Sequence, residues 1–180
     1  MKKKVLSNID IYTDYVKGID IPRERIRVDI FESFVLKRRI SDNPKDYSYQ
    51  DYKIHHSQPL AWLQDYIRDH FNLYHNKVLI PQLQWGNIYG PQQQSYNRNQ
   101  VEPLLLRDSA DYTYIYCVDV QPNSCEFVME YDDNRRKNRT WHVPLENNKF
   151  ILFPSNQRYF ISKNKGSEMN VFLTVNCEYQ

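Results

Sequence analysis

The fold of this chain is decided by one segment near its end, Lys149-Phe-Ile-Leu-Phe-Pro-Ser-Asn-Gln-Arg-Tyr-Phe-Ile161. Two short apolar runs flank the corner Phe153-Pro154-Ser155, and this pattern predicts a buried strand, a tight turn and a second strand. We expect Phe150, Leu152, Tyr159 and Ile161 to pack this corner. From Val78 onward the apolar residues recur with a period of two, so residues 78–180 are predicted to form a β-barrel around it.

The strands predicted for this barrel are short and separated by turn residues. They are 78–89 (interrupted by Pro81), 111–120, 126–131, 140–143, 149–153, 159–162 and 170–177. Because Pro122-Asn-Ser124 reads as a turn, we expect 126–131 to pair back on 111–120 as a hairpin. Short strands with frequent turns are typical of a sandwich or a jelly roll.

The first 76 residues form a different kind of sequence. Residues 1–56 are predicted to be an arm (1–24), a half-buried strand (Arg25–Phe31) and a polar excursion (37–56). Residues 57–76 are predicted to be the principal helix, with Ser57 as its N-cap. Its apolar residues recur at spacings of three and four: Leu60, Leu63, Ile67, Phe71 and Tyr74.

Composition limits the class of protein. With 180 residues, 41% of them hydrophobic, the whole chain (1–180) is expected to form one domain with a sizeable core. The formal net charge of +2 gives no general reason to expect nucleic acid or membrane as a partner. The basic start is not followed by an apolar signal core, and the three cysteines contain no CxxC pair. We therefore expect a cytoplasmic protein with reduced, half-buried thiols.

Common catalytic motifs are missing from the sequence. Four scattered glycines cannot build a phosphate-binding loop, and there is no GxSxG motif. Asp132-Asp133 precedes Arg135-Arg-Lys137, which favours a solvated loop of mixed charge over a cation site. His56, His70, His75 and His142 are interpreted as surface or boundary residues.

The order of motifs from Trp85 onward resembles the double-stranded β-helix of the Fe(II)/2-oxoglutarate-dependent oxygenases, particularly compact members found in bacteriophages. The features that carry the resemblance extend over residues 57–177: the preceding helix, Trp85-Gly-Asn-Ile-Tyr-Gly90, the strand at 112–120, its return at 125–131, Phe150-Ile-Leu-Phe-Pro-Ser155 and a last strand ending in Asn176. The resemblance implies a mainly β jelly roll with an N-terminal extension and one principal α-helix. An unrelated jelly roll would show the same strand order.

The resemblance also implies where a metal and a co-substrate would bind. The family holds Fe(II) with two His and one carboxylate, the first two ligands coming from a His-x-Asp-type pair. The corresponding loop here, residues 94–100, contains no histidine, and the third ligand position holds Tyr159. The arginine that would grip 2-oxoglutarate is replaced by Asn170. The positions of this vestigial pocket are Tyr96, Asn97, Arg98, Asn99, Tyr159 and Asn170.

We therefore predict no metal, no cofactor and no catalytic residue, and interpret the chain as a non-catalytic structural or interaction protein. The resemblance suggests a bacteriophage virion component (neck, tail or baseplate) that passes through the host cytoplasm. Its partners would be other protein chains, contacted through the arm and the polar loops. One alternative is an active hydroxylase that recruits His55, His56 or His142. Another is a barrel that binds a sugar through Tyr159, Asn97 and Asn99.

Overall fold

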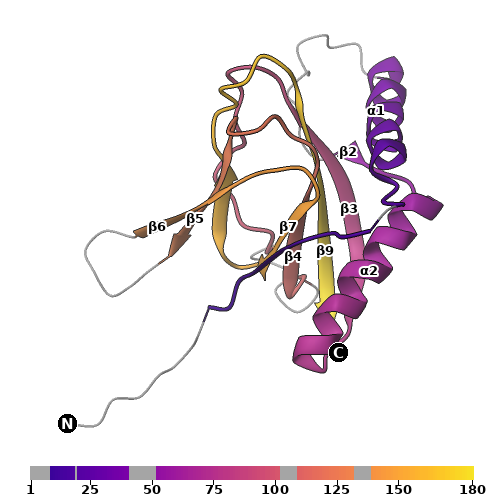
Figure 1. Cartoon of the computed structure of the whole chain (residues 1–180), viewed down its shortest axis with the longest axis vertical. Coiled ribbons are helices and arrows are strands. Elements are labelled where there is room, and N and C mark those ends of the chain that lie inside the picture. Colours follow the sequence, from indigo (N-terminus) through magenta and orange to yellow (C-terminus); the bar gives the residue numbers. More distant parts are fainter. Residues whose placement is uncertain (1–8, 19, 41–51, 102–108, 132–138) are drawn as a thin grey trace.

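The structure, a computed structural model, describes residues 9–18, 20–40, 52–101, 109–131 and 139–180 (Figure 1). Two helices lie in these ranges, α1 (Arg23–Ile40) and α2 (Gln58–His75). The strands in the same ranges are β1 (Tyr12–Tyr15), β2 (Tyr52–Lys53), β3 (Leu79–Tyr89), β4 (Tyr112–Asp119), β5 (Glu126–Tyr131), β6 (Arg139–Pro144), β7 (Lys149–Pro154), β8 (Arg158–Ile161) and β9 (Asn170–Tyr179). Neither helix is long and apolar enough to cross a membrane.

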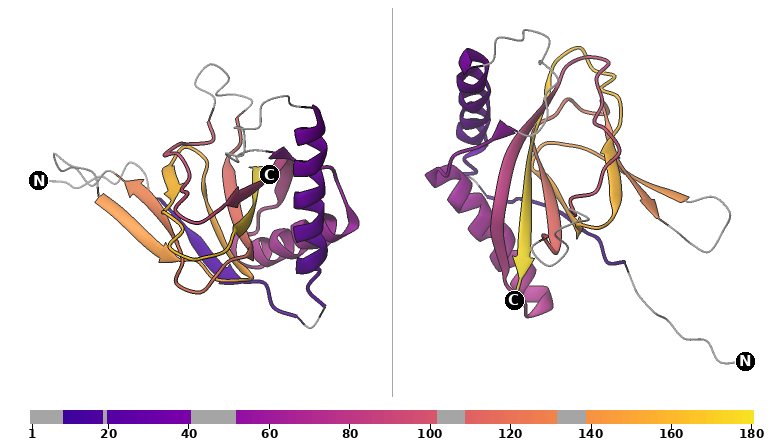
Figure 2. Two further views of the ribbon diagram at one scale, coloured as in Figure 1. Left: turned by 90° about the horizontal axis from the view of Figure 1, so that it is seen from above. Right: turned by 180° about the vertical axis from the view of Figure 1, so that it is seen from behind.

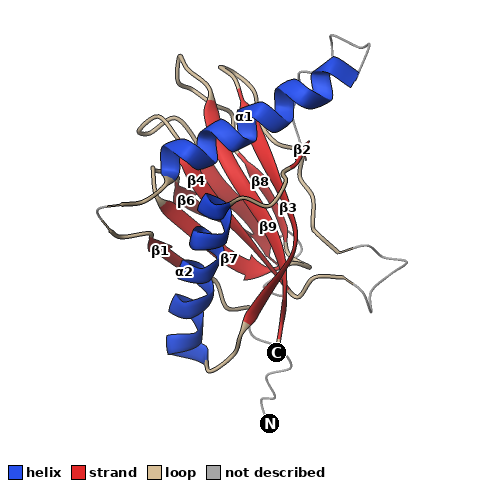
Figure 3. Ribbon diagram, turned by 90° about the vertical axis from the view of Figure 1, so that its right-hand side faces the viewer, coloured by secondary structure: helices blue, strands red, loops and turns tan. Residues whose placement is uncertain are grey.

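The strands form two antiparallel sheets. The larger has the order β1-β7-β4-β9-β3-β2, and the smaller has the order β6-β5-β8. Figure 2 shows the two sheets facing each other, and Figure 3 shows both helices on the outer face of the larger sheet. The predicted jelly-roll architecture, mainly β with two sheets, is confirmed.

Strand β9 shows how the larger sheet separates two cores. Its outward side chains, among them Leu173 and Val175, join the apolar cluster beneath α1 and α2. Phe172, which points the other way, joins the cluster between the two sheets. Alternate residues of one strand therefore stabilise both layers, because successive side chains of a strand point to opposite faces. Gly86 on β3 lets α1 approach closely, since a Cβ there would lie 2.6 Å from Cγ2 of Ile30.

The predicted helix over 57–76 is confirmed as α2. Ser57 adopts an extended conformation and its hydroxyl accepts a hydrogen bond from the backbone N–H of Leu60 at 3.4 Å. The same hydroxyl donates to Oδ2 of Asp29 on α1 at 2.6 Å, which ties the start of one helix to the other. Asn76 ends the helix in the left-handed conformation with a φ of 51°.

The prediction of a strand at Arg25–Phe31 is wrong, because these residues belong to α1. Ile26 and Ile30 are both fully buried, while Val28 between them is only half-buried. The spacing of four between the two buried residues is that of a helix face, and Pro22 precedes the first turn. The arm contributes a short strand instead, since β1 pairs with β7.

The predicted hairpin between 111–120 and 126–131 is also wrong. Strands β4 and β5 lie in different sheets: β4 pairs with β7 and β9, and β5 pairs with β6 and β8. The turn between them holds a hydrogen bond from Ser124 N to Gln121 O at 3.2 Å. It carries the chain across the barrel from one sheet to the other.

Several predicted segments lie partly outside the described residues. These are the start of the arm (1–8, which includes Lys2–Lys4), most of the polar excursion (41–51), part of the loop after β3 (102–108) and the charged loop (132–138).

Two buried tyrosines on β4 give a matched test of this packing. The hydroxyl of Tyr114 is fully buried and has no hydrogen-bond partner within the described ranges, whereas that of Tyr116 donates to Oδ1 of Asn148 at 3.0 Å. We expect Tyr114→Phe to leave the free energy of unfolding unchanged or to raise it, because it removes a buried donor that bonds to nothing. Tyr116→Phe should lower it by about 1 kcal/mol. Urea unfolding midpoints measure both, and equal losses would contradict this account.

Candidate functional site

The Phe153-Pro154-Ser155 corner joins β7 to β8 across the mouth of the barrel. The backbone N–H of Gln157 donates to the carbonyl of Pro154 at 3.0 Å, which closes the turn. The hydroxyl of Ser155 lies 2.8 Å from the hydroxyl of Thr113 on β4. The backbone N–H of Ser155 donates to the carbonyl of Asp111. The corner is therefore anchored to β4 by both its backbone and its side chain.

Tyr159, on β8, points into the barrel and is 2% exposed. Its ring stacks on Phe127 with centroids 5.6 Å apart and meets Phe153 edge to face at 4.8 Å. Its hydroxyl accepts a hydrogen bond from Nε2 of Gln100 at 2.7 Å. Three aromatic rings and one amide thus occupy the place where the resemblance implies a metal ligand.

The loop at 94–100 lies beside Tyr159, as the resemblance implies. The backbones of Arg98 and Tyr159 exchange two hydrogen bonds, of 3.0 and 2.9 Å. The side chains of Tyr96, Asn97 and Asn99 are exposed, and Tyr96 is 71% exposed. Three of the vestigial-pocket positions therefore present their side chains to solvent. The side chains of Asn97 and Asn99 do not join Tyr159 in a buried site that could hold a sugar.

Asn170 is fully buried at the start of β9. Its Nδ2 donates to Oγ of Ser124 at 2.8 Å and approaches Sγ of Cys125 at 3.3 Å. Its Oδ1 accepts from the backbone N–H of Gln121 at 3.0 Å. The structure therefore uses Asn170 to hold the turn that carries the chain between the sheets.

The histidines that an unrecognised metal site would need lie elsewhere. His142 is on β6, exposed, with Nδ1 3.0 Å from Oε2 of Glu126. His55 and His56 line a hollow outside the barrel, next to Gln64 of α2. Among the described residues no group of three His, Cys, Asp or Glu side chains could hold a metal ion.

Two pairs of neutral polar side chains are hydrogen-bonded to each other inside the barrel. Thr113 donates to Oδ1 of Asn176 at 2.9 Å, and Thr174 donates to Oδ1 of Asn87 at 2.7 Å. Fe(II) requires imidazole and carboxylate ligands, and 2-oxoglutarate requires a cation. The side chains at the corresponding positions, Tyr159 and Asn170, do not fit either group. Gln100, which holds Tyr159, was not singled out in the sequence, and no local motif marks it.

Comparison with known proteins finds a similar fold among solved structures. No family model and no curated protein match the sequence. Among solved structures, AviO1 from Streptomyces viridochromogenes Tue57 matches with a TM-score of 0.64 at 10% identity, over 93% of this chain and 89% of that one. The viral collagen prolyl hydroxylase vCPH from Paramecium Bursaria Chlorella virus-1, in complex with 2OG, matches with a TM-score of 0.55 at 13% identity, over 92% and 95%.

A third match is an oxidoreductase of the 2OG-Fe(II) oxygenase family from Burkholderia pseudomallei. Its TM-score is 0.52 at 11% identity, and the match covers 68% of this chain and 56% of that one. The chain thus spans little more than half the length of that oxidoreductase.

The chain has the fold of the 2OG-Fe(II) oxygenases. At these identities the likeness concerns the fold alone. It confirms the resemblance of fold seen in the sequence.

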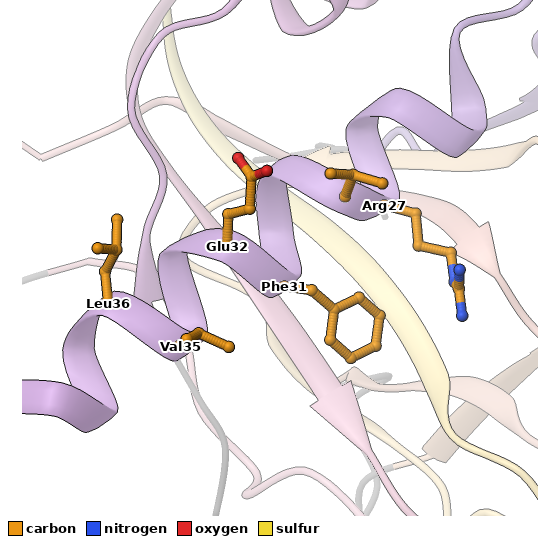
Figure 4. Close-up of a pocket in the computed structure, with 6 residues that line it drawn as sticks. Arg27, Phe31, Glu32, Val35 and Leu36 are labelled. Carbon is orange, nitrogen blue, oxygen red and sulfur yellow. The ribbon is translucent and has the colours of Figure 1, made fainter.

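A surface hollow of about 570 Å³ lies along α1 (Figure 4). The described residues that line it all belong to α1. Arg27 and Phe31 point to the same side of the helix, and the guanidinium of Arg27 lies 5.2 Å from the centre of the Phe31 ring. Val35 and Leu36 extend the apolar surface toward the end of the helix. This hollow is separate from the barrel interior.

Substitution of Tyr159 tests whether the position serves packing. Tyr159→Phe loses the hydrogen bond from Gln100 and should cost about 1 kcal/mol of unfolding free energy. Tyr159→His also loses aromatic packing and should cost about 3 kcal/mol without creating Mn(II) affinity. Urea unfolding and Mn(II) electron paramagnetic resonance measure the two effects, with the exposed Tyr96→His as control. Stoichiometric Mn(II) binding by Tyr159→His would show that other metal ligands lie close to position 159, and it would contradict a role in packing alone.

The three cysteines should be inert in the folded protein. All are free and fully buried, not half-buried as predicted. Burial raises the pKa of Cys125 to about 11 and that of Cys177 to about 12, and it also raises the pKa of Cys117. Since the reactive thiolate is scarce below these values, Ellman's reagent at pH 8 should label no thiol before unfolding and all three after it. Rapid labelling of a native thiol at pH 8 would contradict the described packing.

Proposed function

We propose that this protein is a non-catalytic interaction protein built on an oxygenase-like barrel. The observation that carries the proposal is the environment of Tyr159. Its hydroxyl is bonded to Gln100 and its ring is packed between Phe127 and Phe153. A phenol held in this way is a poor substitute for the imidazole that an iron site requires.

The environment of Asn170 supports the same proposal. Recognition of a dicarboxylate relies on the paired donors and the positive charge of a guanidinium. Asn170 offers a neutral amide, and both ends of that amide are already bonded within the 121–125 turn. The side chain at the position that would anchor a co-substrate instead stabilises the fold.

A narrower form of the proposal is a component of a bacteriophage particle, in the neck, tail or baseplate. Its support is the resemblance of residues 57–177 to compact phage-type members. In this form the partners are other chains of the particle, contacted through the N-terminal arm and the polar loops. The protein would act in the host cytoplasm during assembly and then in the virion.

An active hydroxylase is the alternative, because the similar solved structures are named as oxygenases and hydroxylases. It would need ligands from outside the usual positions. His55, His56 and His142 lie outside the barrel interior, so they give this alternative little support.

Metal content and co-substrate turnover separate the two functions. Protein purified with Fe(II) under anaerobic conditions should contain well below one iron per chain and should release no succinate from 2-oxoglutarate. Its unfolding temperature should not change with Mn(II) plus N-oxalylglycine, an analogue of the co-substrate. A solved hydroxylase of this fold, treated identically, serves as the positive control. One iron per chain together with succinate release would overturn the non-catalytic proposal.

Mass spectrometry of purified phage particles tests the narrower form, a component of the particle.

A further inference from the structure

A groove lies between the edge strand β1 and helix α2. Figure 3 shows α2 on the outer face of the larger sheet, close to β1. We call this groove the β1–α2 groove. Its volume is about 540 Å³, within the usual range for binding pockets. Its lining comes from residues 11–14, from two side chains of β7, and from four of α2: Phe150, Leu152, His70, Phe71, Tyr74 and His75. It is separate from the barrel interior where the oxygenase fold would place its chemistry.

The apolar part of the groove is built from aromatic rings. Phe71 and Phe150 are buried within it. The ring of Tyr12 lies 5.4 Å from that of Phe71 and 4.3 Å from that of His75. Tyr74, at the rim, is 72% exposed. The groove therefore has a covered apolar floor and one large ring that faces solvent.

The charge beside these rings is negative. The Asp10 carboxylate is close enough to contribute, after burial, to the raised pKa of both Tyr12 and Tyr112. Asp10 is exposed and has no ion-pair partner among the described residues. Asp14, in contrast, already has His70 at 2.9 Å and Lys17 at 3.5 Å. Asp10 is thus the carboxylate in this area that is available to a partner.

The backbone of β1 has an open edge along the same groove. The N–H of Val16 donates to the carbonyl of Asn148, in the turn before β7, at 2.8 Å. Backbone groups alternate along an antiparallel strand, so Thr13 and Ile11 direct their N–H and C=O groups away from β7. Among the described strands none pairs with β1 on that side.

The other end of this edge is blocked within the chain itself. The N–H of Tyr15 donates to Oδ1 of Asp14 at 2.7 Å, and the N–H of Lys17 donates to the hydroxyl of Tyr66 at 3.0 Å. Around Ile11–Thr13, where the groove is, the outward N–H groups have no such acceptor among the described residues. Protected edges are usual in β proteins, so an unprotected part beside a pocket indicates where a strand can be added.

We propose that the β1–α2 groove binds an extended segment of a partner protein that carries an arginine two residues away from a leucine-sized apolar side chain. The inference rests on the proposed function, because it names the partner chemistry of an interaction protein. The segment pairs its backbone with Ile11–Thr13, and its apolar side chain enters the ring-lined floor. Side chains two residues apart in a strand share a face, so the guanidinium reaches Tyr74 and Asp10. Arginine suits this place because it both stacks on aromatic rings and pairs with carboxylates.

The test is a titration of the full chain with the fluorescein-labelled peptide Ser-Arg-Thr-Leu-Thr-Arg-Ser, followed by fluorescence anisotropy. Tyr74→Ala should weaken binding about tenfold, because it removes the ring on which the guanidinium stacks. Asp10→Asn should weaken it about threefold at low salt and less at 0.5 M salt, since salt screens exposed charges. A peptide with glutamate in place of arginine should bind at least tenfold more weakly.

Tyr96→Ala is the matched control, because Tyr96 is 71% exposed and Tyr74 is 72% exposed, but only Tyr74 lines the groove. Its affinity should equal that of the unchanged protein. Absence of binding, equal effects of the two tyrosine variants, or equal binding of the glutamate peptide would each overturn the inference. Iron-dependent turnover would refute the non-catalytic proposal without altering this titration, so the two failures are distinguishable.

Discussion

The larger sheet is buried on both faces, and this constraint shapes the rest of the molecule. Its outer face needs two helices to cover it, and its inner face needs the smaller sheet. Charged side chains are expensive on such a sheet unless they are paired. Lys149, at the start of β7, illustrates the rule, because its ammonium group lies 3.8 Å from Oε1 of Glu146 and donates to the carbonyl of Pro144 at 2.7 Å. The polar groups deeper in the barrel, such as Thr113 and Asn176, are neutral and hydrogen-bonded.

The sequence predicted the strands well where the signal is local. Alternation and turn residues placed all seven predicted strands from Val78 onward close to their observed bounds, and Ser57 correctly marked the start of α2. Strand partners are a property of the whole fold. The turn at Pro122–Ser124 looks like a hairpin turn, but it carries the chain from the larger sheet to the smaller one. Nothing in those few residues distinguishes a hairpin from a connection between facing sheets.

The error at Arg25–Phe31 has a different cause. Ile26, Val28 and Ile30 satisfy a period of two, while Ile26 and Ile30 alone satisfy the helical spacing of four. Burial distinguishes the two periods, because Ile26 and Ile30 are fully buried and Val28 is not. Extending the window to Phe34, which packs against the same cluster, continues the helical spacing. A seven-residue window was too short to separate the two periods.

The position of Tyr159 in the fold was predicted more accurately than its contacts. Counting from Ser155 placed Tyr159 on a buried strand beside the 94–100 loop, because the corner fixes the start of β8. Gln100 could not be found in this way, since its contact with Tyr159 spans 59 residues of sequence. The exposure of Asn97 and Asn99 could not be foreseen either. It depends on how the loop pairs with β8, which is settled by two backbone hydrogen bonds.

The joint absence of all the expected iron and co-substrate residues has a physical explanation. In an iron site, buried ionic ligands are compensated by the metal. Once one ligand is lost and the metal no longer binds, the remaining carboxylate or guanidinium becomes an unpaired buried charge, which costs several kcal/mol. Neutral residues that complete hydrogen bonds within the barrel then stabilise the fold, as Asn170 does with Ser124 and Gln121. On the outer surface, in contrast, Asp10 and Tyr74 keep charge and aromatic area exposed to solvent.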